Sequence, residues 1–85
     1  MQQSMLETYI HLLKTLIQEG PLERALLMNK AKINSEKLQQ FLNFAIKEKR
    51  VEKITSNKDK EHFRITQKGI TVLNYFVEAK QVVLN

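Results

Sequence analysis

The segment from His62 to Gly69 constrains the fold of this chain more than any other stretch. It opens with alternating polar and apolar side chains, so that Phe63 and Ile65 share one face of a short predicted strand. A helix is expected to follow, because Thr66 can cap a helix N-terminus. Gly69 then falls in the first helical turn, where a glycine lowers helix stability and therefore indicates a close approach of another backbone segment.

The segments before and after this strand predict a further strand and two helices. Residues 35–48 carry apolar side chains at helical spacing, and Asn34 is a good N-cap for that helix. Residues 50–54 predict a short strand, and the charged turn at 55–61 joins it to the next strand as a hairpin. Residues 70–84 form a last apolar helical segment. Helix, strand, polar turn, strand and helix therefore follow one another.

The first third of the chain predicts two more helices. Ser4 and Glu7 form a capping box ahead of an apolar stripe that ends at Gly20, which indicates a helix of about fifteen residues. A second, shorter helix is expected at about residues 22–30, and Ile33 in the turn after it should plug the core. The inner face of that second helix is expected to be Leu22, Ala25, Leu26 and Met28 or Asn29.

The positive charge of the chain is concentrated in its middle. The formal net charge is +5, but residues 24–68 alone carry twelve Lys or Arg and five acids, a sum of +7. Residues 1–23 sum to −2 and residues 69–85 to zero. A basic middle favours a polyanionic partner, whereas apolar ends favour a core or self-association. A lysine-rich surface that only aids solubility is the alternative.

Composition bounds the class of protein. A chain of 85 residues makes one domain, residues 1–85, and the lack of cysteine excludes disulfides and thiolate metal sites and favours an intracellular, cytoplasmic setting. No apolar run approaches the roughly 20 residues that cross a bilayer, and the N-terminus has no basic signal-peptide region. With two histidines and no glycine-rich phosphate loop, the sequence indicates no enzyme, no metal, no cofactor and no evident small-molecule ligand.

Two motifs resemble a known family. The first is LMNKAKIN at residues 27–34, continued by Phe41 and Leu42; the second is FRITQKG at residues 63–69, followed by Leu73. With the order of elements, these motifs resemble winged helix-turn-helix regulators, in particular the small archaeal regulators of the ArnR-like type. The resemblance implies an α+β, mostly α fold with three helices, a two-stranded β-hairpin wing and a C-terminal helix.

Two positions depart from the family pattern. The pair Ala25 and Leu26 stands where the family usually has Thr and Arg, so phosphate contact from the second helix is not expected. The family usually has a glycine after the recognition helix, where this chain has Lys49, Arg50 and Val51. A residue other than glycine must then adopt a left-handed backbone conformation, or the turn differs.

The resemblance makes residues 35–48 a recognition helix in the major groove of duplex DNA, and residues 50–65 a basic wing on the phosphate backbone. Amide side chains can form bidentate hydrogen bonds with adenine edges. The side chains expected to read bases are Lys37, Gln39, Gln40 and Asn43. Those expected to contact phosphates are Ser35, Lys47, Lys53, Lys58, Lys60 and Arg64. The alternatives are that the amides are ordinary solvated side chains and that the wing lysines protect a sheet edge.

Residues 69–85 are expected to form a C-terminal dimerisation helix, because their apolar stripe is broad for a terminal helix. The expected homodimer interface comprises Leu73, Phe76, Val77, Val83 and Leu84. The alternative is that this helix packs on the first helix within a monomer.

The leading function is therefore a DNA-binding transcriptional regulator or architectural protein. The second hypothesis is a winged-helix module that binds protein and not DNA. RNA binding is a third hypothesis with little support, since it relies on exposed aromatic side chains and only Phe44 could serve in the helix at residues 35–48.

Overall fold

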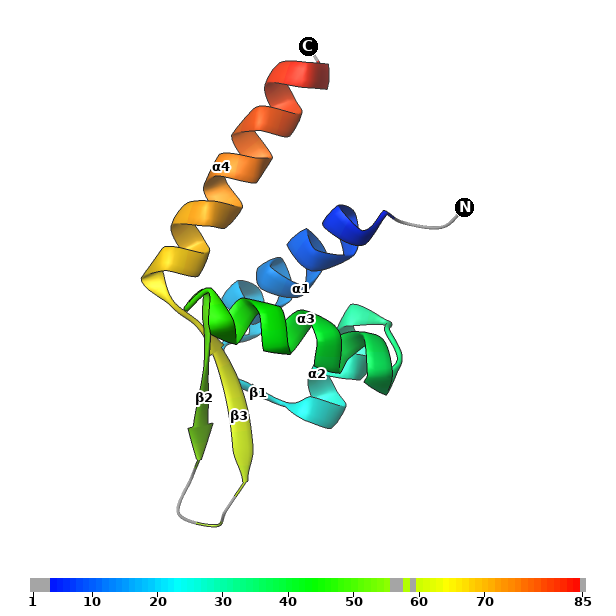
Figure 1. Cartoon of the computed structure of the whole chain (residues 1–85), viewed down its shortest axis with the longest axis vertical. Coiled ribbons are helices and arrows are strands. Elements are labelled where there is room, and N and C mark those ends of the chain that lie inside the picture. The colour runs from blue at the N-terminus through cyan, green and yellow to red at the C-terminus, as the bar shows by residue number, and fades with distance from the viewer. Residues whose placement is uncertain (1–3, 56–57, 59, 85) are drawn as a thin grey trace.

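The computed structural model describes residues 4–55, 58 and 60–84, the last six of these as backbone only. These residues form four helices and three short strands (Figure 1). In order they are α1 (Met5–Glu19), β1 (Leu22–Glu23), α2 (Arg24–Ala31), α3 (Ser35–Lys47), β2 (Val51–Thr55), β3 (Glu61–Ile65) and α4 (Gln67–Leu84). The mostly helical α+β fold predicted from the sequence is confirmed, with the elements in the expected order.

The sheet has three antiparallel strands in the order β1-β3-β2, one more than the expected two-stranded hairpin. The additional strand β1 pairs Leu22 with Phe63 and Glu23 with His62. The hairpin of β2 and β3 extends from the helical body as a wing, while α4 projects in the opposite direction (Figure 1). Helices α1, α2 and α3 lie together between these two projections.

Strand β1 corrects the expected start and inner face of the second helix. Because Leu22 and Glu23 pair with β3, α2 begins at Arg24 and not at residue 22. Because α2 starts two residues later than expected, a different face of the helix is buried. Leu27 and Ala31 are buried, and Met28 packs partly against the core. Three of the expected inner residues, Ala25, Leu26 and Asn29, are exposed instead.

The core is built from one face of each element. Its largest fully buried side chains are Leu12, Leu13, Leu16, Leu27, Leu38, Leu42, Val51 and Phe63. Ile33, in the turn after α2, packs against this core as predicted. Ile46 is the last of the apolar side chains at helical spacing in residues 35–48, and it is 37% exposed because it lies at the edge of the stripe centred on Leu38, Leu42 and Ala45.

The joint that links α3, the wing and α4 depends on Lys49, Arg50, Thr66 and Gly69. Lys49 has a φ of 61°, so a residue other than glycine does adopt the left-handed conformation after α3. The Thr66 hydroxyl accepts a hydrogen bond from the Gly69 amide at 3.1 Å and donates one to the Lys49 carbonyl at 2.7 Å. A Cβ on Gly69 would collide with the Arg50 carbonyl and would lie 2.7 Å from Cγ1 of Ile65. The predicted helix cap and the predicted close backbone approach are both confirmed.

Helix α4 contributes its first half to the core and leaves other apolar side chains uncovered. Leu73 is 4% exposed and Val77 packs partly against the core, whereas Tyr75 is 70% exposed. Leu73 was expected in a dimer interface, but its burial by its own chain leaves it no surface to offer a partner. The side chains of Val83 and Leu84, also expected in that interface, lie outside the described residues.

Candidate nucleic-acid interface

Helices α2 and α3 form a helix-turn-helix with a three-residue turn. Lys32 ends α2 in a left-handed conformation, with φ 57° and ψ 46°. Ile33 anchors the turn in the core, and the Asn34 side chain accepts a hydrogen bond from the Lys37 amide at 2.7 Å. This cap fixes where α3 begins and therefore which of its side chains face outward.

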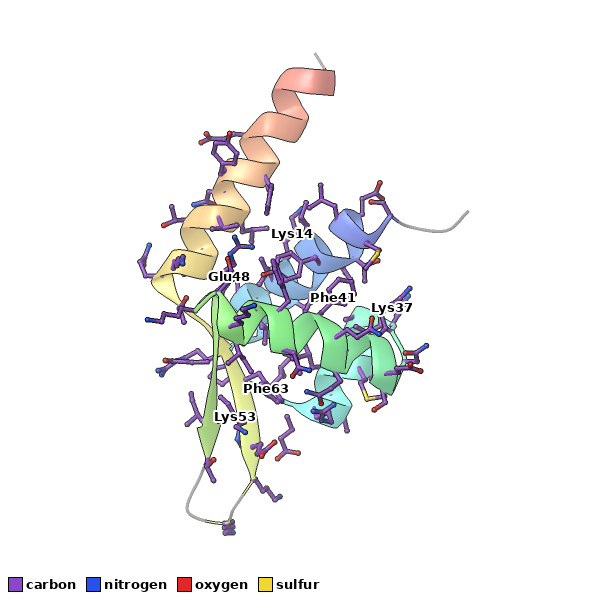
Figure 2. All side chains as sticks on the ribbon, in the orientation of Figure 1. Lys14, Lys37, Phe41, Glu48, Lys53 and Phe63 are labelled. Atoms are coloured by element: carbon purple, nitrogen blue, oxygen red, sulfur yellow. The ribbon has the colours of Figure 1, made fainter. Side chains whose placement is uncertain are left out.

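The face of α3 opposite the core carries exposed polar side chains. Leu38, Phe41, Leu42 and Ala45 are buried on the other side of the helix. All six side chains of α3 that the sequence analysis assigned to base or phosphate contact are exposed: Ser35, Lys37, Gln39, Gln40, Asn43 and Lys47. Figure 2 shows Lys37 at the end of α3 near α2, far from Lys53 on the wing. Exposed polar side chains therefore extend along α3 from its first residue, Ser35, to its last, Lys47.

A chain of hydrogen bonds joins α2 to the middle of this face. The Arg24 guanidinium donates to Oε1 of Gln39, and Nε2 of Gln39 donates to Oδ1 of Asn43 at 2.7 Å. Arg24 also lies over the ring of Phe63, 6.0 Å from its centroid. The sequence analysis singled out Gln39 and Asn43 but missed Arg24, because only the folded chain brings α2 and α3 together.

Three of the four cations in residues 51–65, the wing, are paired with acids. Lys53 lies 3.7 Å from Glu61, Lys60 lies 3.9 Å from Glu23, and Arg64 donates to Glu52 from Nε at 2.8 Å. The Lys and Arg side chains of residues 51–65 therefore project from the wing as expected, but acids reduce the sequence charge of this segment to +1. Exposed ion pairs of this kind add little to stability, and their main effect here is to lower the positive potential.

Two lysines that the sequence analysis did not assign lie at the two ends of α3. Lys32 precedes the helix and Lys49 follows it, both exposed and both in left-handed backbone conformations. Neither forms an ion pair with a described residue. The sequence did hold one signal for Lys49, because this lysine stands where the family usually has a glycine in a left-handed conformation.

An apolar hollow of about 370 Å³ lies between α1 and α3. It is lined by Met5, Leu6, Tyr9, Gln40, Phe41 and Phe44. The ring of Tyr9 stacks on Phe41 with centroids 5.9 Å apart and meets Phe44 edge-on at 5.7 Å. Arg50 lies 5.5 Å from the Phe44 centroid and donates to the Tyr9 hydroxyl at 3.5 Å. Phe44 is thus 49% exposed but is already in contact with an aromatic ring and a cation.

Two other features are absent from the part of the chain that the structure describes. No three His, Cys, Asp or Glu side chains there lie close enough together to hold a metal ion. None of its helices combines the length and the apolar composition that a bilayer crossing requires. The exposed polar side chains of α3 and of the adjoining wing form the candidate site.

The sequence and the fold agree on a family. Residues 2–83 match the family model described as winged helix-turn-helix. The chain belongs to the winged helix-turn-helix family. No curated protein is similar enough in sequence to count as a relative. The narrower resemblance to ArnR-like regulators stays a prediction.

Solved structures of bacterial and archaeal proteins share this winged helix-turn-helix fold. A MarR family transcriptional regulator from Silicibacter pomeroyi superimposes with a TM-score of 0.79 at 15% identity, covering 93% of this chain and 53% of its own. The PcaV regulator from Streptomyces coelicolor gives 0.77 at 16%, covering 91% and 61%. Sso10a-2, a DNA-binding protein from Sulfolobus solfataricus, gives 0.73 at 22%, covering 98% and 86%. The chain thus spans only about half to three-fifths of the two longer regulators but most of Sso10a-2.

Proposed function

We propose that this winged helix-turn-helix protein is a non-enzymatic DNA-binding regulator or architectural protein that inserts α3 into the major groove. The observation that carries the proposal is the outward face of α3, where Gln39, Gln40 and Asn43 are all exposed on a helix fixed by its cap and its core contacts. The names of the similar structures support it, since they include transcriptional regulators and a DNA-binding protein.

The dimensions of α3 suit a major groove. Its 13 residues span about 20 Å, and a groove about 12 Å wide admits one helix. Amides offer both a donor and an acceptor, which is what discrimination among base edges requires. The wing then lies beside the helix, where its exposed tip lysine, Lys58, can approach the phosphate backbone.

We assign phosphate contacts first to the cations that form no ion pair within the described residues. Lys47 at the C-terminal end of α3 and Lys58 on the wing form no ion pair with any described residue, like Lys32 and Lys49. Ser35 is exposed at the first position of α3 and can donate its hydroxyl. A wing cation that is paired with an acid must give up that acid before it can bind a phosphate. We therefore expect a smaller contribution to DNA affinity from each of Lys53, Lys60 and Arg64.

We further propose that two copies associate through α4. The helix has 18 residues and projects away from the body, so its distal half has little of its own domain to pack against (Figure 1). Phe76 and Val77 are only partly covered, and the sequence continues with Val83 and Leu84. A two-fold dimer would present two copies of α3 to successive major grooves about 34–36 Å apart.

The dimer is tested by replacing Phe76 and Val83 together with Asp and measuring molar mass in solution. We expect the parent protein to sediment as a dimer at tens of micromolar and the variant as a folded monomer. A parent that is already monomeric would overturn the dimer but not DNA binding. A replacement of Asn74, exposed on the same helix, by Asp is the matched control and should leave the dimer intact.

A protein-binding module is the second candidate, favoured by the apolar hollow and the exposed Met5, Leu6 and Phe44 around it. RNA binding loses support, because Phe44 already contacts Tyr9 and Arg50 and does not stand free to stack on a base.

An electrophoretic titration with duplex DNA at two salt concentrations distinguishes the two leading candidates. We expect the logarithm of the affinity to fall linearly with the logarithm of salt concentration, by roughly 0.9 per phosphate contact. Lys47→Gln should reduce that slope, whereas Lys14→Gln, on the exposed side of α1, should not. No binding at low salt would favour the protein-binding candidate.

A further inference from the structure

We infer that Arg24 is a positioning residue that sets base preference, by turning the Asn43 amide so that it offers N–H donors outward and selects guanine. This inference rests on the proposed function, since it concerns how the same face of α3 reads a duplex. The structure joins Arg24, Gln39 and Asn43 in one chain of hydrogen bonds across two helices.

Arg24, where this chain of hydrogen bonds begins, is held in place by the sheet. Arg24 is the first residue of α2 and directly follows β1, whose Leu22 is in register with Phe63 of β3. The Arg24 guanidinium lies 6.0 Å from the centroid of the Phe63 ring, and Phe63 itself is only 2% exposed. A cation over the face of a buried ring is attracted by the ring quadrupole. Phe63 is labelled beneath α3 in Figure 2.

The direction of every hydrogen bond in the chain follows from the chemistry of Arg24. A guanidinium has donors and no acceptor, so Gln39 must turn its oxygen toward Arg24. The NH2 group of Gln39 is then directed to Asn43, four residues later on the same helix face, and meets its oxygen at 2.7 Å. Asn43 is left with Oδ1 turned back along α3 and with both N–H donors of Nδ2 available.

This orientation changes which base Asn43 can recognise. Bidentate recognition of adenine needs one acceptor and one donor from the same amide, to match N6 and N7 of the base. Guanine presents two acceptors, N7 and O6, in the major groove. To read adenine, Asn43 would have to turn Oδ1 outward and release the NH2 of Gln39. Gln40 does not take part in this chain of hydrogen bonds, so its amide can still offer both an acceptor and a donor to a base.

The test begins by selecting preferred duplexes from a random pool with the parent protein. The position read by Asn43 is the one whose preference disappears in Asn43→Ala. We expect guanine there, and we expect 7-deazaguanine, which lacks the N7 acceptor, to weaken binding roughly 5- to 150-fold. Arg24→Met keeps the length of the side chain but has no donor, so it should lose most of the preference for guanine over adenine. Arg24→Lys retains a donor-only group and should restore part of the preference.

Two controls separate base preference from folding and from general affinity. Lys14→Met removes an exposed cation of α1, outside the candidate interface, and should leave the guanine preference unchanged. Asn43→Asp alters only an exposed side chain, accepts from Gln39, and has no donor to offer, so it should also lose the guanine preference.

The outcomes separate the inference from the proposed function. Adenine at the Asn43 position, or a guanine preference that survives Arg24→Met, would overturn the inference and leave DNA binding in place. Equal, salt-dependent binding to every duplex would overturn it in the same way. A parent protein that binds no duplex would overturn the proposed function and the inference together.

Discussion

The outward face of α3 and the wing both project from the same core, yet they hold their polar groups in different ways. On the face of α3, Gln39 and Asn43 form a directional chain of hydrogen bonds with Arg24 of α2, and this chain carries a single charge. On the wing, Lys53, Lys60 and Arg64 each lie beside an acid. The wing therefore offers less positive potential than its lysine content suggests, whereas α3 offers oriented donors. Under the proposed function, we therefore expect base selection to depend on α3 and the wing to supply only a modest part of the phosphate attraction.

The largest effect is expected from Gly69→Ala, which breaks the joint that both surfaces share. A Cβ there would collide with the Arg50 carbonyl, which is backbone and cannot rotate away. Overpacking of this kind costs about 1–3 kcal/mol or more of unfolding free energy. Thermal or urea unfolding measures the loss, and Asn74→Ala on the exposed side of α4 should stay within about 0.5 kcal/mol of the parent. An unchanged unfolding midpoint in Gly69→Ala would show that the joint is not as tight as the structure has it.

The next effect separates α3 from the wing. Replacing Gln40 or Asn43 with Ala should narrow the difference in binding free energy between a preferred and a random duplex by about 1–3 kcal/mol. Replacing Lys58 with Ala should weaken both duplexes alike, because a phosphate contact carries no sequence information. Competition titrations with the two duplexes give both quantities. Equal losses on both duplexes for Gln40→Ala and Asn43→Ala would remove base reading from α3.

A smaller effect locates the phosphate contacts. Lys32→Gln and Lys49→Gln remove a charge at either end of α3 without adding a branched side chain at these left-handed positions. Each should lower the slope of log affinity against log salt by roughly 0.9 if the lysine contacts a phosphate. Lys53→Gln, whose lysine is paired with Glu61, should lower it less. The reverse ranking would place the main phosphate contacts on the wing.

The smallest expected effect is an increase in DNA affinity. Glu52→Gln releases Arg64 from its acidic neighbour and should increase affinity for every duplex by less than about 1 kcal/mol, the usual size of an exposed ion pair. Glu7→Gln, which removes an acid from the first turn of α1, is the matched control and should not change affinity. A decrease in affinity for Glu52→Gln would mean that the pair positions Arg64 for binding.

The features that the sequence predicted well depend on neighbouring residues. The caps at Ser4, Asn34 and Thr66 each bond an amide three residues away, so short-range spacing was enough to find them. The close approach of another backbone segment to Gly69 was also predicted, because a glycine lowers helix stability and its place in a first helical turn therefore indicates a steric requirement.

The features that the sequence missed depend on pairing between distant segments. Strand β1 exists because Leu22 meets Phe63, 41 residues later, and nothing in two residues could indicate a strand. Its presence moved the start of α2 and with it the buried face, which was predicted wrongly. Arg24 gains its role from Gln39 in another helix and Phe63 in a strand. The acidic partners of the wing cations were present in the sequence, but the register that brings them together comes from the fold.

The side-chain amides of α3 offer the most direct test of the central claim that this helix reads DNA bases. In a nuclear magnetic resonance titration of ¹⁵N-labelled protein with duplex DNA, we expect the NH2 signals of Gln39, Gln40 and Asn43 to shift with the backbone signals of α3. The signals around Lys14 on α1 should stay in place. Shifts confined to residues around the apolar hollow, or to the wing with the α3 amides unmoved, would contradict the account.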